Sequence, residues 1–133
     1  MPIYAGGRNP SYSGAGVFTV SYDLTAATGT TGGGVVAIAN PLGADVVITN
    51  AILNITTGAT TNTNTMDVGV AANATTSSDT LFDGQTTAAG LKTPGGTNGA
   101  VPRLWASGQY VTATAGATLA GMVATLTLIC VRA

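Results

Sequence analysis

Short segments that alternate between apolar and polar residues recur along this chain, and clusters of Gly, Thr, Asn and Pro separate them. The clearest is VFTVSYDL at 17–24, in which every second residue from Phe18 to Leu24 is apolar. A period of two is typical of a β-strand with one buried face. Helix is disfavoured, because β-branched residues and glycine are abundant while Glu is absent and Lys, Arg and Gln are few. The pattern therefore predicts an all-β fold.

The same reading predicts seven or eight strands, and it leaves two local questions open. Segment 45–56 is apolar on both faces near its middle, so it either lies centrally between two layers or carries a β-bulge. We expect it to form a hairpin with 66–70. Residues 71–100 are mostly Ala, Thr, Ser and Gly, and one short helical turn near 74–82 stays open there. The expected strands are 17–24, 35–39, 45–56, 66–70, 101–106, 109–115 and 120–132.

The domain organisation follows from how such strands can bury their apolar faces. Without helices to cover them, they can pack only against another sheet, as in a sandwich, jelly roll or barrel. We expect a single-domain antiparallel β-sandwich of jelly-roll type at 17–133. Residues 1–16 are predicted to form an extended N-terminal arm, in which Tyr4, Arg8 and Tyr12 either belong to a frayed terminus or dock against a neighbouring subunit.

The charged and titratable residues exclude several classes of function. They make up 7% of the 133 residues, against about 25% in a typical globular protein. There is no His and no Glu, so most acid/base, nucleophilic and metal-binding constellations cannot be assembled. A net charge of −1 supplies no basic field for binding phosphates. We therefore expect that the protein is not an enzyme, binds no cofactor and does not bind nucleic acid.

Membrane insertion and disulfide bonding are also disfavoured. The most apolar stretch, 120–131, is shorter than the roughly 18 residues of a membrane-spanning helix, and the N-terminus lacks the pattern of a secretory signal. We expect a soluble product made in a host cytoplasm. Cys130 is the single cysteine and is predicted to be a small buried apolar residue. Asp79 and Asp83 could suggest a calcium-binding loop, but such a loop needs a glutamate and the chain has none. We therefore interpret Asp79 as a local cap and Asp83-Gly84 as a turn.

Trp105 offers two interpretations, with Arg103 and Tyr110 close by in the sequence. It either forms an exposed aromatic platform for a sugar or a partner chain, or it packs in the core, and the core position is favoured. The low charge of the whole chain points to contact with other protein, because interface cores are depleted of charged residues. We infer an oligomer or a component of a lattice.

A family resemblance adds to this reading. The stretch ADVVITNAILNITTGATTNTNTMDVGVAANATTSSDTLFDG and the ending GQYVTATAGATLAGMVATLTLICVRA, which looks like a closing hairpin, resemble small virion proteins of tailed bacteriophages. The chain is similar to their head decoration, or cement, proteins. This resemblance implies a β-sandwich, often trimeric, on the outside of the capsid where major capsid subunits meet. It implies no catalytic residues, and the arm at 1–16 would suit a role in gripping the capsid.

The leading hypothesis is therefore a capsid decoration protein that binds the major capsid protein on the exterior of the virion and forms a homo-oligomer, expected to be a trimer. The alternative is a receptor- or carbohydrate-binding module of a phage tail or head fibre, with Trp105 and the loops of 71–100 as the recognition surface. A tail-tube or connector component is a third hypothesis. The exposure of Trp105 separates the first two, and the expected contact residues are Tyr4, Arg8, Tyr12 and Trp105.

Overall fold

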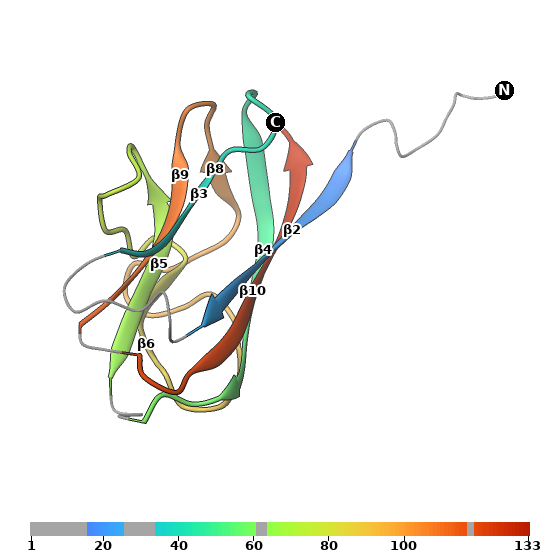
Figure 1. The fold of residues 1–133 in the computed structure, drawn as a ribbon. Coiled ribbons are helices and arrows are strands. Elements are labelled where there is room, and N and C mark those ends of the chain that lie inside the picture. Colours follow the sequence, from blue (N-terminus) through green and yellow to red (C-terminus); the bar gives the residue numbers. More distant parts are fainter. Residues whose placement is uncertain (1–15, 26–33, 61–63, 117–118) are drawn as a thin grey trace, which may run out of the picture.

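Two antiparallel β-sheets pack face to face in the computed structural model, which describes residues 16–25, 34–60, 64–116 and 119–133 (Figure 1). The predicted all-β sandwich is confirmed, and no helix occurs among the described residues. The arm predicted at 1–16 lies outside them except for Gly16. The strands are β2 (Val17–Thr25), β3 (Gly34–Ala39), β4 (Val46–Thr57), β5 (Thr65–Ala71), β6 (Phe82–Thr86), β7 (Gly90–Lys92), β8 (Arg103–Trp105), β9 (Tyr110–Ala115) and β10 (Val123–Arg132).

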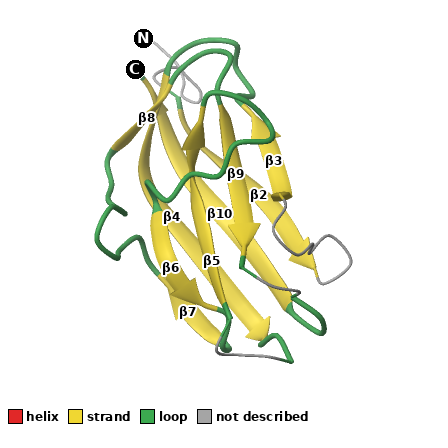
Figure 2. Ribbon diagram, turned by 90° about the vertical axis from the view of Figure 1, so that its left-hand side faces the viewer, coloured by secondary structure: helices red, strands yellow, loops and turns green. Residues whose placement is uncertain are grey.

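One sheet is centred on β4 and the other on β9 and β5. The β4 sheet has the order β2-β10-β4, and the short strands β7 and β8 both pair with β4. The β9 sheet has the order β3-β9-β5-β6. Figure 1 shows the two layers side by side, and Figure 2, turned by 90°, looks onto their broad faces. The jelly-roll pattern of connections stays a prediction.

The hairpin expected between 45–56 and 66–70 is wrong, because β4 and β5 belong to different sheets. Strand β4 pairs with β10 and with the short strands β7 and β8, while β5 lies between β9 and β6, so neither has a side free for the other. The closing hairpin suggested for the C-terminal stretch fails for the same reason, since β9 and β10 also lie in different layers.

A bulge in β4 explains why both faces of this strand look apolar in the sequence. Cys130 of β10 opposes Ile48 and Ile129 opposes Asn50, so Thr49 is an extra residue in the ladder. The hydroxyl of Thr49 donates a hydrogen bond to the carbonyl oxygen of Ile129 at 3.1 Å. The extra residue shifts the alternation by one position, which confirms the bulge alternative. As a result, five residues on both sides of the bulge are buried: Val46, Ile48, Ala51, Leu53 and Ile55.

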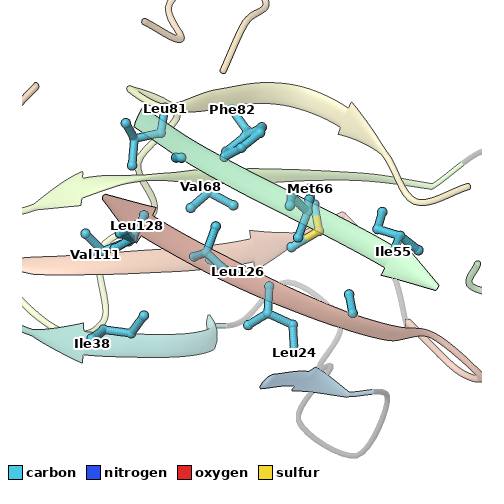
Figure 3. Close-up of a cluster of buried hydrophobic side chains, with 14 of the residues drawn as sticks. Leu24, Ile38, Ile55, Met66, Val68, Leu81, Phe82, Val111, Leu126 and Leu128 are labelled. Atoms are coloured by element: carbon cyan, nitrogen blue, oxygen red, sulfur yellow. The ribbon is translucent and has the colours of Figure 1, made fainter. Parts of the chain in front are cut away.

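The core lies between the two sheets (Figure 3). Leu126 and Leu128 of β10 meet Met66 and Val68 of β5 across it, and all four side chains are almost completely buried. Cys130 is buried in the same cluster, as predicted, and burial raises the pKa of its thiol to about 11. The core is thus uncharged, and it consists of the inward-facing residues of two pleated layers.

Residues 71–100 differ most from the sequence reading. The helical turn left open near 74–82 is not formed, and this segment is an irregular loop that leads into β6. The pair Asp83-Gly84 is not a turn between elements. It lies within β6 at a shift of register between β5 and β6, and Gly84 has a φ of 65° there. A glycine suits this bulge, because a positive φ is strained for other residues.

Candidate interaction surface

Trp105 is 0% exposed and packs inside the sandwich. It opposes Val46 in the pairing of β8 with β4, and its indole nitrogen Nε1 donates a hydrogen bond to the carbonyl oxygen of Gln109 at 3.1 Å. Its ring therefore cannot serve as an aromatic platform or as a contact to a partner, which corrects its inclusion among the contact residues. Tyr4, Arg8 and Tyr12 lie outside the described residues.

Asn40 fixes the position of the segment that carries Trp105. Its amide nitrogen Nδ2 donates to the carbonyl oxygens of Ala44 and Trp105, both at 2.9 Å. Its oxygen Oδ1 accepts a hydrogen bond from the backbone nitrogen of Leu42, also at 2.9 Å. The side chain thus closes the turn between β3 and β4 and ties it to β8. The sequence shows Asn40-Pro41 only as a turn signal.

Asp67 and Asp83 accept hydrogen bonds from backbone nitrogens, whereas Asp79 accepts one from a side chain. Asp83 accepts a hydrogen bond from the backbone nitrogen of Asn98, and Asp79 accepts one from the side-chain nitrogen of Asn98, both at 2.9 Å. Asp67 accepts one from the backbone nitrogen of Gly84 at 2.8 Å. Within the described part of the chain, no group of three His, Cys, Asp or Glu side chains could hold a metal ion. No described helix is long and apolar enough to cross a membrane.

The outer face of the β9 sheet is covered by the chain's own loop at 72–80. Gly69 of β5 has no side chain, and a Cβ atom there would collide with the hydroxyl of Ser78 and lie 2.5 Å from the backbone nitrogen of Thr80. The hydroxyl of Thr112 on β9 donates to the carbonyl oxygen of Thr76 at 2.8 Å. The glycine thus lets the loop lie directly on β5 and β9.

No loop among the described residues packs on the outer face of the β4 sheet in this way, and none of the residues on this face is buried. Its residues follow from the strand registers, because the alternate residues of β10 are buried and face the other way. Asp23 is its one charged side chain. We call this surface the open face, and it consists of Val17, Thr19, Ser21, Asp23, Val47, Asn50, Ile52, Asn54, Thr57, Leu91, Leu104, Val123, Thr125, Thr127, Ile129 and Val131.

Two leucines stand out on the open face. Leu91 of β7 is 73% exposed and Leu104 of β8 is 53% exposed, and they pair with Asn54 and Val47 of β4. Val17 of β2, at the opposite edge of the same face, is also 73% exposed. Sequence reasoning missed Leu91, because a single leucine between glycine and lysine has no periodicity. The only sequence feature that could have pointed to this position is an isolated leucine in a segment rich in Gly and Thr.

The open face is large enough for a specific contact. It is four strand positions wide at about 4.8 Å each and roughly ten residues long at about 3.3 Å each. The resulting area of roughly 600 Å² approaches the ~800 Å² per partner of a standard protein interface. With almost no charge to desolvate, this face is the best candidate for an interaction surface on the described residues.

Comparisons with known proteins point to a fold and not to a family. No family model matches the chain, and no curated protein matches its sequence. In three dimensions it is similar to a chain of the solved structure "Capsid of Ralstonia phage GP4", with a TM-score of 0.58 and 17% sequence identity. The match covers 89% of this chain and 85% of that chain. The chain therefore shares its fold, over nearly its whole length, with a chain in a phage capsid structure.

Proposed function

We propose that this chain is a structural protein of a tailed-phage virion, and specifically a capsid decoration protein. The observation that carries the proposal is the similarity of fold, across 89% of the chain, to a chain in a phage capsid structure. The resemblance of the sequence to small virion proteins of tailed bacteriophages supports the same role independently. The role requires no catalytic residue.

The open face supplies the contact to the capsid lattice in this proposal. It buries threonine and apolar side chains at little desolvation cost, since Asp23 is its one charge. A protein that binds only the assembled shell stabilises the shell by the free energy of that binding. The major capsid protein is the proposed partner, on the outside of the particle.

One part of the proposal concerns a feature beyond the open face. The arm at 1–16, with Tyr4, Arg8 and Tyr12, acts as a second contact to the capsid. The receptor- or carbohydrate-binding alternative depended on an exposed Trp105. Because that side chain is buried, we do not advance this alternative.

Cosedimentation of the purified protein with capsids that lack it tests the proposal. Saturable binding at a fixed ratio to the major capsid protein, and a higher temperature of capsid disruption, are the expected results. A variant without residues 1–16 keeps the fold and loses binding if the arm contributes. An absence of binding at any concentration would overturn the proposed function.

A further inference from the structure

Within the described part of the chain, strand β2 forms an open edge of the β4 sheet. It is nine residues long and pairs with β10 along its whole length, from Val17 to Thr25. No strand among the described residues pairs with its other side. Figure 2 shows it at the margin of the sheet. Backbone N–H and C=O groups along such an edge favour pairing with another strand.

The core is incompletely covered at this edge. Val20 and Tyr22 face inward, opposite Leu128 and Leu126 of β10, and both leucines are 0% exposed. Val20 is nevertheless only half-buried, and Tyr22 is 40% exposed. The side chains of an added strand would lie beside these residues and extend the apolar layer. The edge therefore offers both hydrogen-bonding groups and apolar surface.

The other side of the β4 sheet is built differently. There β7 and β8 are three residues each, and such short edge strands limit pairing with other chains. In the β9 sheet, β6 is bulged at Gly84, and Phe82 bridges to Gly95 of the following loop. Strand β2 is neither short nor bulged in its pairing with β10. It also contains no Pro, Lys, Arg or Gly that would discourage pairing, and Asp23 is its single charge.

We propose that β2 pairs with β2 of a second copy of this chain, antiparallel about a two-fold axis near Ser21. In this register Val20 opposes Tyr22 of the second copy, so inward-facing residues stay together on the core side. Asp23 opposes Thr19 of the second copy, so no like charges meet. The strand is thus complementary to itself, which a two-fold interface requires. This inference does not depend on the proposed function.

Sedimentation velocity of the full chain over a range of concentrations tests the pairing. The wild type is expected to form a species of twice the 13.0 kDa mass of the chain. Tyr22→Lys places an inward-pointing charge at the edge, a device that natural edge strands use against pairing, and Ser21→Lys places two like charges opposite each other at the axis. Each variant is expected to weaken dimerisation by at least about tenfold.

The matched control is Ala74→Lys, which adds the same charge to an exposed alanine in the loop 72–80 on the other sheet and is expected to leave dimerisation unchanged. Thermal unfolding shows whether each variant is folded, and Ser21→Lys serves if Tyr22→Lys is not, since Ser21 is exposed. Hydrogen exchange is expected to slow in β2 as the dimer forms. A wild type that stays monomeric, with the edge covered by its own chain, would overturn the inference. An oligomer that is indifferent to both β2 variants would overturn it equally.

Discussion

Replacing the two exposed leucines of the open face by lysine tests whether this surface binds the capsid. In the double variant Leu91→Lys/Leu104→Lys, two apolar side chains become charged at the edge formed by β7 and β8. Both side chains are more than half exposed, so the fold loses little when they change. We expect normal folding and strongly reduced capsid binding.

The size of the effect follows from the exposed fractions. Fully burying a leucine contributes about 1.5–3 kcal/mol. Exposures of 73% and 53% therefore leave about 1–2 kcal/mol for Leu91 and roughly 1–1.5 kcal/mol for Leu104 to contribute on docking. The sum of about 2–3.5 kcal/mol corresponds to a loss of affinity between roughly 30-fold and 400-fold. Desolvation of two ammonium groups adds to this loss, so these values are a lower bound.

The assay is quantitative cosedimentation with capsids that lack the protein, at several concentrations of each variant. The matched control is Ala39→Lys/Ala74→Lys, which adds two lysines at exposed alanines that lie off the open face. We expect the control to bind within about threefold of the wild type, because separate surface changes contribute within ~0.5 kcal/mol. If the leucine variant binds as well as this control, the open face is not the capsid contact.

Three further predictions concern stability and reactivity. Asn40→Asp keeps the acceptor and removes both donors, and at neutral pH it places a carboxylate beside two carbonyl oxygens. We expect a loss of about 2–4 kcal/mol in urea unfolding. This destabilisation should shrink as the pH falls, because the two carbonyl oxygens raise the pKa of the introduced carboxyl above its value in the unfolded chain. Equal stability of the variant and the wild type would contradict the predicted role of Asn40. Gly69→Ala forces the covering loop off the β9 sheet and should lower the free energy of unfolding by about 1–3 kcal/mol, whereas a neutral result in the same assay would refute the close packing. Cys130 should react with a thiol reagent only at the rate of unfolding, and rapid labelling of the native protein would show instead that the thiol is accessible. The stability of the protein should fall as the pH rises from 9 through about 11, because the thiol pKa is raised in the folded state.

Much of the fold could be predicted from local patterns. The patterns at 17–24 and 120–132 mark strands whatever their partners are, because the pleat of a strand sends neighbouring residues to opposite faces, although the second strand begins only at Val123. The lack of His and Glu excludes most catalytic sites before any fold is known. The short strand β7 could not be found this way, since three residues are too few to establish a period.

The sequence by itself determined that this chain is an all-β, weakly charged protein, because side-chain periodicity and composition are local properties. Only the tertiary structure decided which strands are neighbours. It separated β4 from β5 and turned Trp105 inward, and it left Leu91 on an uncovered face. The physical reason is that pairing and burial depend on contacts between residues far apart in the chain. The bulge at Thr49 is the clearest case, since the register of β10 decides which of the apolar residues of β4 reach the core.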